Sequence, residues 1–336
     1  MAHGFGMLDL TGLLLLTVCL ALLFDFSNGW HDCANAVATV VSTRVLSPLA
    51  AVVLAGVLNV AGAFFSTAVA KMIGGGIVFP DAITNAVVAS ALAGAILWNL
   101  FTLILGLPTS SSHALIGGLV GSAVAHGGWT VVQFKGLRAI LEAMILSPLF
   151  GFGVGFLVMV VVSWAFFRVP RGIATKVFSR LQLLSASFMA FSHGANDAQK
   201  AMGIITLALV ASGQLSSSEV PTWVIVACAL AMGLGTVIGG WRIMRTLGMR
   251  IVKLEPVHGF AAETGAATVL LFTAHFGLPV STTHTITSSI LGVGATSRLS
   301  AVRWGVTTKI LSAWLFTFPG AGLLGAAVYA LLVSLI

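Results

Sequence analysis

The sequence predicts an all-α, polytopic membrane protein with ten to twelve transmembrane segments in two inverted repeats, some of them broken or re-entrant helices. Of its 336 residues, 58% are hydrophobic and only 7% are charged, and the mean hydropathy is +1.07. A soluble domain carries roughly 25% charged residues, because its surface must face water. The composition therefore excludes a soluble globule, and two motifs that each occur twice indicate the repeat.

Apolar stretches along the chain are long enough to cross a bilayer, for which a helix needs about 20 apolar residues. The ten stretches are 8–27, 47–70, 82–106, 108–126, 139–167, 183–210, 223–240, 259–276, 279–295 and 304–331. Several of them contain glycine or proline, which interrupt helices. We therefore expect some segments to be broken helices or re-entrant pairs.

The net charge of +7 does not indicate nucleic-acid binding, because the basic residues cluster between apolar segments. With the N-terminus placed outside, twelve basic residues fall inside, three fall outside, and Lys200 lies within a span. The inner residues are Arg44, Arg168, Arg171, Lys176, Arg180, Arg242, Arg245, Arg250, Lys253, Arg298, Arg303 and Lys309. Cytoplasmic loops are enriched in Lys and Arg. We expect both termini outside a bacterial inner membrane, and a cytoplasmic linker at 168–182 between repeats 1–167 and 183–336.

Two motifs recur in the same order at nearly one offset. Segment 28–36, Asn-Gly-Trp-His-Asp-Cys-Ala-Asn-Ala, returns at 193–201 as His-Gly-Ala-Asn-Asp-Ala-Gln-Lys-Ala. Segment 107–113, Leu-Pro-Thr-Ser-Ser-Ser-His, returns at 278–284 as Leu-Pro-Val-Ser-Thr-Thr-His. Because each half has an odd number of expected spans, the second half would enter the membrane upside down. Inverted repeats with interrupted polar segments are typical of secondary transporters; a duplicated structural bundle is the alternative.

The first motif carries an acidic stripe. Asp25, Asn28, Asp32 and Asn35 are spaced i, i+3, i+7 and i+10, on one helical face. A charge at mid-bilayer costs about 2.5–3.5 kcal/mol, so these carboxylates should face a cavity, a partner or a bound cation. The equivalent stripe in the second copy is Ala190, His193, Asp197 and Lys200. The alternative is a buried polar cluster in which the Asp and Lys of the second copy simply pair.

The second motif predicts an anion site. In each copy a proline precedes hydroxyl residues at a helix start, where free N–H groups and the helix dipole attract anions. Ordinary helix capping at a loop is the alternative. A tetrahedral oxyanion suits donors from several directions, and the absence of an Arg inside the spans favours weak binding and release. The predicted phosphate-binding residues are Ser110, Ser111, Ser112, Ser281, Thr282, Thr283, Asn28, Asn196 and Lys200.

Charge counting then predicts coupling to a cation. Three aspartates and Lys200 leave a charge of −2, which a dianionic phosphate would raise to −4. Buried charge of that size requires counter-ions, so we expect symport, with H⁺ favoured and Na⁺ or a divalent metal as alternatives. The candidate coupling residues are Asp25, Asp32, Asn35, Asp197, Glu142 and Glu263. No organic cofactor is expected, and no metal ligand is assigned firmly, Asp32 and Asp197 being the candidates.

The two remaining acids and the motif histidines have alternative interpretations. Glu142 and Glu263 could each relay protons or be tucked into a pair, with Arg138 as the partner of Glu142. His113 and His284 are expected to orient the helix starts rather than to bind a metal.

These residues also carry a family resemblance. Segments 28–40 and 193–200, together with Pro-Val-Ser-Thr-Thr-His at 279–284, resemble the PiT family of inorganic phosphate transporters, over about 24–320. The resemblance implies proton- or sodium-driven phosphate symport through inverted repeats, with both motifs forming the site. Lys200 stands where sodium-coupled members of the family tend to carry Asn. That difference resembles the bacterial low-affinity branch, which is linked with protons and neutral metal–phosphate.

Three other functions were weighed. A sulfate permease of the same fold and a divalent-metal channel with Asp and His ligands stay open. An intramembrane hydrolase is disfavoured, because Ser110–Ser112 and His113 lie on one turn and cannot align as nucleophile and base. We therefore predict a protein that is not an enzyme. Its expected partners are phosphate, a coupling cation and the lipid bilayer; a homodimer is left open, and nucleic acid is excluded.

Overall fold

The computed structural model describes residues 10–79 and 82–335, and residues 8–9 of the first expected span lie outside these ranges. In the described part the regular structure is helical, apart from one isolated bridge between Val78 and Val132. The all-α prediction is confirmed. The first half contains α1 (Leu10–Ser42), α2 (Pro48–Ala63), α3 (Ala68–Gly75), α4 (Asn85–Leu105), α5 (Ser111–Gly127), η2 (Trp129–Val131) and α6 (Phe134–Ala165). The second half contains α7 (Arg171–Ala211), α8 (Thr222–Ile238), α9 (Trp241–Arg245), η3 (Thr246–Arg250), α10 (Pro256–His275), α11 (Thr282–Ser297), η4 (Leu299–Ala301) and α12 (Trp304–Leu335).

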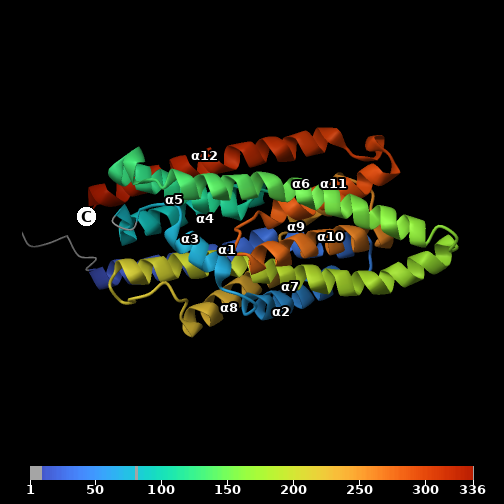
Figure 1. The fold of residues 1–336 in the computed structure, drawn as a ribbon, viewed down its shortest axis with the longest axis horizontal. Helices are drawn as coiled ribbons and strands as arrows, with labels where there is room; N and C mark the ends of the chain where they lie inside the picture. Colours follow the sequence, from blue (N-terminus) through green and yellow to red (C-terminus); the bar gives the residue numbers. More distant parts are fainter. Residues whose placement is uncertain (1–9, 80–81, 336) are drawn as a thin grey trace, which may run out of the picture.

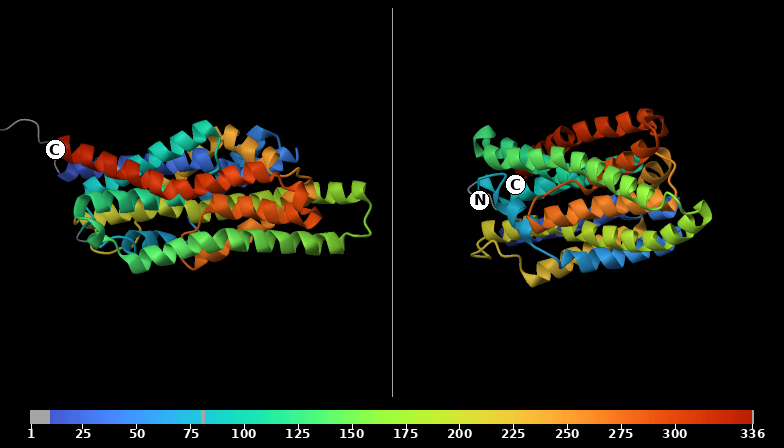
Figure 2. Two further views of the ribbon diagram at one scale, coloured as in Figure 1. Left: turned by 90° about the horizontal axis from the view of Figure 1, so that it is seen from above. Right: turned by 45° about the vertical axis from the view of Figure 1, so that its right-hand side comes forward.

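The second half repeats the helix order of the first. Each half starts with a long helix that carries the acidic motif and ends with a 32-residue helix that follows a single 3₁₀ turn. Figure 1 shows that α1 and α6 run along the bundle in one direction, whereas α7 and α12 run back in the other. The long helices keep this lengthwise arrangement in the two views of Figure 2.

Four helices, α1, α4, α6 and α12, are long and apolar enough to span a bilayer. The pair formed by α8 and α9–η3, bent by 61°, is a fifth candidate. Other helices are shorter, such as α2 and α11 with 16 residues each, or carry a polar motif, such as α7. The structure therefore supports a polytopic membrane protein, with fewer clear spans among the described residues than the ten to twelve expected segments.

The outer helices α6 and α12 present apolar side chains outward. Only 22% and 11% of their most apolar windows are buried in the molecule. Trp164 and Phe167 at the end of α6, and Leu315 on α12, are 82%, 80% and 74% exposed. Large apolar side chains exposed along both helices indicate a non-aqueous environment. These helices are therefore suited to face lipid.

Helices of the two halves pack against one another. Helices α1 and α5 of the first half pack on α8 and α12 of the second half. Helices α7 and α11 of the second half pack on α2 and α6 of the first half. A Cβ atom at Gly29 would lie 2.2 Å from the carbonyl oxygen of Met232 in α8, and one at Gly194 would lie 2.2 Å from that of Asn59 in α2. The glycine of each acidic motif therefore permits close contact with a helix of the other half.

Two matching turns position the second motif. The chain leaves α4 through Gly106 and α10 through Gly277, with φ values of 68° and 69° that favour glycine. The following Leu107 and Leu278 donate backbone N–H groups to the carbonyls of Thr102 and Thr273, at 3.0 and 2.9 Å. Both turns thus start α5 and α11 at equivalent positions.

Most of the expected basic linker is helical. Residues 166–170 connect α6 to α7, and α7 begins at Arg171, so that residues 171–182 form its first turns. Arg168, Arg171, Lys176 and Arg180 are all exposed there. The basic character of the segment is therefore displayed from a helix rather than from a flexible loop.

Candidate functional site

The acidic motifs of α1 and α7 meet inside the bundle. One ligand atom each from Asp32, His193 and Asp197 lies within 4.8 Å of the others. All three side chains are buried, at 2%, 0% and 0% exposure. Two carboxylates from separate halves therefore share one desolvated site, where a cation or a proton would relieve their repulsion.

Asp32 receives donors from both copies of the second motif. Its Oδ1 lies 2.5 Å from Nδ1 of His31. Its Oδ2 accepts hydrogen bonds from the hydroxyls of Ser111 on α5, at 3.2 Å, and Thr283 on α11, at 3.4 Å. Both hydroxyl-bearing helix starts therefore converge on a single carboxylate.

Asp197 is paired more strongly. Lys200 donates to its Oδ1 at 2.6 Å, and the hydroxyl of Thr282 donates to its Oδ2 at 3.1 Å. Asn35 of α1 joins the group by donating to the hydroxyls of Thr283, at 2.9 Å, and Thr282, at 3.4 Å. The Asp–Lys pair is thus part of a network that spans both halves, and not an isolated pair.

The six hydroxyl residues divide into three groups. Ser110 and Ser281 are N-caps, because the hydroxyl of each accepts the backbone N–H of the histidine three residues on, at 3.2 Å. Ser111, Thr282 and Thr283 contact the aspartates, as described above. Ser112 links the two copies of the motif by donating to the carbonyl of Val280 at 3.1 Å. The capping alternative thus applies to the first position of each triplet only.

Several buried polar atoms near the aspartates have no hydrogen-bond partner in the described part of the chain. They comprise the side-chain oxygens and nitrogens of Asp25, Asn28 and Asn196, Oδ1 of Asn35 and Nε2 of His193. Asp25 lies near Asn28 and Cys228, but no hydrogen bond of good geometry reaches its carboxylate. An unsatisfied buried polar group costs about 1–3 kcal/mol, more when charged. A polar cargo with its counter-ions would supply the missing partners.

Glu263 and Glu142 have opposite environments. Glu263 of α10 is fully buried and accepts from Thr39 of α1 at 2.5 Å and from Gln182 of α7 at 3.1 Å. The hydroxyl of Ser185 also donates to it. Glu142 is exposed, pairs with Nε of Arg138 at 2.7 Å, and lies apart from the cluster. Glu142 therefore matches the alternative of a simple pair with Arg138, whereas the hydrogen bonds of Glu263 connect helices of both halves.

Replacing Glu263 by Gln should lower the midpoint of thermal unfolding of the purified protein. Hydrogen bonds to a charged group contribute about 1.5–3 kcal/mol, and an amide nitrogen would face at least one of the three donors. The matched control is Glu142→Gln, which removes an exposed pair of little energetic weight. Fluorescence-detected unfolding in detergent measures both variants, and equal midpoints would contradict the structural role of Glu263.

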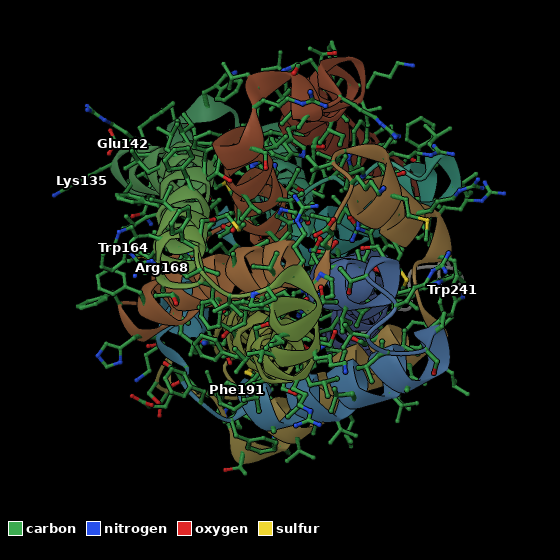
Figure 3. The ribbon with its side chains drawn as sticks, turned by 90° about the vertical axis from the view of Figure 1, so that its right-hand side faces the viewer. Lys135, Glu142, Trp164, Arg168, Phe191 and Trp241 are labelled. Carbon is green, nitrogen blue, oxygen red and sulfur yellow. The ribbon has the colours of Figure 1, made fainter. Side chains whose placement is uncertain are left out.

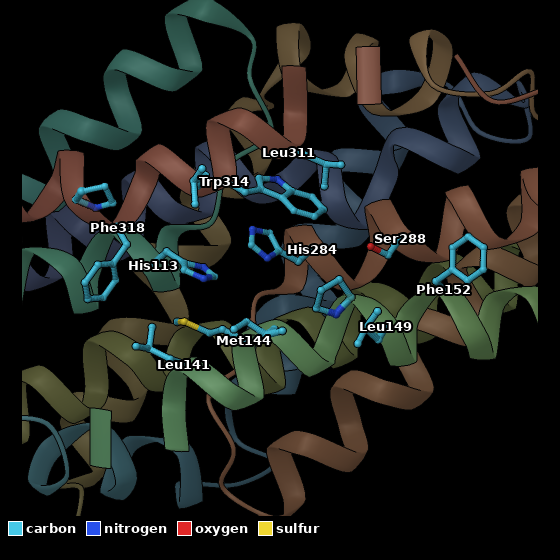
Figure 4. Close-up of a pocket in the computed structure, with 14 residues that line it drawn as sticks. His113, Leu141, Met144, Leu149, Phe152, His284, Ser288, Leu311, Trp314 and Phe318 are labelled. Carbon is cyan, nitrogen blue, oxygen red and sulfur yellow. The ribbon is translucent and has the colours of Figure 1, made fainter. Parts of the chain in front are cut away.

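A cavity of about 730 Å³ lies behind the helix starts, between α6 and α12. His113 and His284 line it, with ring centroids 4.7 Å apart, and His284 stacks on Trp314 at 3.7 Å (Figure 4). The Trp314 indole also donates to the carbonyl of Pro108 at 2.9 Å. One tryptophan of α12 thus holds both copies of the second motif. This arrangement agrees with an orienting role for the histidines.

Sequence reasoning missed some partners of the site. One of them is Thr102 of α4, whose hydroxyl lies 3.1 Å from Nε2 of His31. Asn59 of α2 lies 3.1 Å from Nδ1 of His193 and donates to Thr236 of α8 at 2.8 Å. The sequence signal that could have identified Asn59 is an amide inside an apolar stretch, because polar groups within a membrane span are generally paired or functional.

Apolar helices packed around buried carboxylates, an ammonium and convergent hydroxyls define a multi-pass membrane protein of the transporter class. The profile of the phosphate transporter family matches residues 28–325. The chain belongs to this family, so the resemblance noted from its motifs is confirmed. Its relatives are transporters, and the protein is not an enzyme.

Individual relatives cover nearly the whole chain. A probable low-affinity inorganic phosphate transporter of Rhizobium meliloti is 48% identical over 93% of this chain and 94% of its own length. The protein of the same description in Bacillus subtilis is 47% identical over 95% and 96%. A solved structure described as the sodium-dependent phosphate transporter matches with a TM-score of 0.89 and 25% identity, over 96% of this chain and 100% of that one.

Proposed function

We propose that this protein is a secondary active transporter that carries inorganic phosphate together with protons across the plasma membrane. Repeats 1–167 and 183–336 would act as two inverted units around one site. The observation that carries the proposal is the meeting of Asp32 and Asp197 with hydroxyls from both helix starts. The opposite directions of α1 and α7 support inverted repeats (Figure 1).

The need for a cation follows from the charges in the site. Asp25, Asp32 and Asp197 are buried with one ammonium, that of Lys200. A phosphate anion entering this cluster would meet uncompensated negative charge in a dry environment, which is prohibitive without counter-ions. Substrate and cation therefore have to bind together, which is the physical basis of symport.

Lys200 favours protons over sodium. Its ammonium lies 2.6 Å from Asp197, where it would compete with a metal cation for the same carboxylate. Asp25 most needs a neutralising cation, because no hydrogen bond of good geometry satisfies its carboxylate in the described part of the chain. A proton neutralises such a carboxylate without requiring further ligands. The solved structure described as sodium-dependent makes sodium the competing ion to test.

The coupling ion can be tested by uptake of labelled phosphate into proteoliposomes under separate pH and sodium gradients. Uptake driven by the pH gradient alone is the expected result. Uptake that requires sodium and ignores pH would contradict proton coupling. A large excess of sulfate should leave phosphate uptake unchanged, and strong competition would instead favour a sulfate permease.

A divalent metal travelling with phosphate is a second candidate. Asp32, His193 and Asp197 form a set of three ligands of the kind that bind divalent cations. In that case phosphate uptake in metal-depleted buffer would fall and would recover with Mg²⁺ or Zn²⁺. Rapid metal flux without phosphate would favour a channel. Uptake that is indifferent to chelators would leave the proton as the coupling ion.

A further inference from the structure

A second cavity lies away from the aspartate site, at the end of the bundle where α6 turns into α7. Its volume is about 720 Å³, and α6, α7 and the start of α10 line it. The lining changes character with depth: Met159, Val162 and Phe178 form an apolar part, whereas Arg171 and Thr175 lie in the first turns of α7. A cavity that is apolar on one side and cationic on the other suits an anionic amphiphile.

The side chains next to the cavity place it at the membrane surface. Trp164, near the end of α6, is 82% exposed, and exposed Trp side chains mark the level of lipid headgroups. Figure 3 views this end of the molecule, with Trp164 and Arg168 near each other at its edge. The polar part of the cavity therefore lies where a phospholipid headgroup would be.

Positive charge dominates this part of the molecule. Arg171 lines the cavity, and the exposed Arg168, Lys176 and Arg180 lie within three turns of it in sequence. Among the described residues of the lining Glu255 is the one acid, and it forms a capping box with His258 at the start of α10. Basic pockets between transmembrane helices bind anionic lipid headgroups, and each nearby basic residue contributes about 1 kcal/mol.

We propose that this cavity binds an anionic phospholipid. Its phosphate would pair with the guanidinium of Arg171, and its acyl chain would lie against Met159 and Val162. The bound lipid would join the end of α6 to the starts of α7 and α10. These helices carry residues of both halves, so the lipid would stabilise the junction between them.

The test compares lipids on the purified protein in detergent. Phosphatidylglycerol should raise the midpoint of thermal unfolding and remain bound in native mass spectrometry, whereas phosphatidylcholine should do neither. Arg171→Gln should weaken phosphatidylglycerol retention about fivefold, the change that corresponds to about 1 kcal/mol. Arg171→Lys should retain most of the binding because the charge is kept. Glu255→Gln should strengthen retention, because it removes a negative charge from the lining.

The matched control is Arg245→Gln, which removes an exposed basic residue outside the cavity. Equal losses of phosphatidylglycerol retention in Arg171→Gln and Arg245→Gln would overturn the proposal, since they would indicate that the lipid binds to general surface charge. Equal stabilisation by phosphatidylcholine would also overturn it, as would a full effect of inorganic phosphate alone. If Arg171→Gln does not fold, the site can be tested by crosslinking a photoreactive phosphatidylglycerol to the wild-type protein. Crosslinks outside residues 159–178 and 255–258 would contradict the site.

Discussion

Replacing Asp32 or Asp197 by Asn should abolish phosphate uptake while the protein still inserts into the membrane. Each carboxylate accepts from hydroxyls on α5 or α11 and shares the buried cluster with His193. Removing one partner of a buried hydrogen-bonded charge pair costs about 2–5 kcal/mol of binding free energy, which corresponds to a loss of at least about 30-fold in cargo affinity. Initial rates in proteoliposomes measure the effect, and size-exclusion profiles in detergent measure folding.

Glu142→Gln is the matched control for these variants. It also neutralises one carboxylate, but at an exposed position outside the cluster, paired only with Arg138 among the described residues. Its uptake should equal that of the wild type. Near-normal transport by either aspartate variant, or an equal loss in Glu142→Gln, would contradict the assignment of the site.

Replacing Lys200 by Asn should change which gradient drives uptake. In the wild type the ammonium lies 2.6 Å from Asp197, and its removal leaves that buried carboxylate without a counter-ion. Uptake without sodium should therefore fall by at least about 30-fold, following the same energetic argument. Sodium should restore a large part of it, because the amide oxygen of Asn and the free carboxylate are ligands that sodium accepts, as other hard cations do. Uptake under a sodium gradient at constant pH is the measurement.

Lys200→Met separates loss of charge from gain of a ligand. Its side chain is of similar length and offers no oxygen, so sodium should not restore transport in this variant. Equal rescue of the Met and Asn variants by sodium would contradict a ligand role for the amide. A Lys200→Asn protein that keeps the pH dependence of the wild type would show that the ammonium does not decide the coupling ion.

The sequence was informative about helix faces because their period is fixed by backbone geometry. The spacing of Asp25, Asn28, Asp32 and Asn35 predicted one shared face, and all four side chains are buried in α1. The proline and hydroxyl pattern likewise predicted the starts of α5 and α11, where Ser110 caps one helix. Local rules were sufficient in both cases.

Local rules could not separate residues of the same type. Glu142 and Glu263 both lie in apolar stretches, but α6 is an outer helix, whereas α10 packs between α7 and α6. Exposure therefore depends on neighbours far away in the sequence. For the same reason the sequence did not distinguish the capping Ser110 from Ser111, whose hydroxyl reaches Asp32 in another helix.

The sequence alone determined that this protein belongs in a membrane, that it repeats two motifs, and that acids and hydroxyls would lie on particular helix faces. Composition and periodicity suffice for this, because lipid excludes charge and helices repeat every 3.6 residues. Only the tertiary structure decided that Asp32, Asp197 and His193 meet within 4.8 Å and that the local Asp197–Lys200 pair is linked through Thr282 to Asn35 of α1. Such contacts depend on how α1 and α7 cross the helices of the opposite half, and no local pattern in the chain encodes that packing.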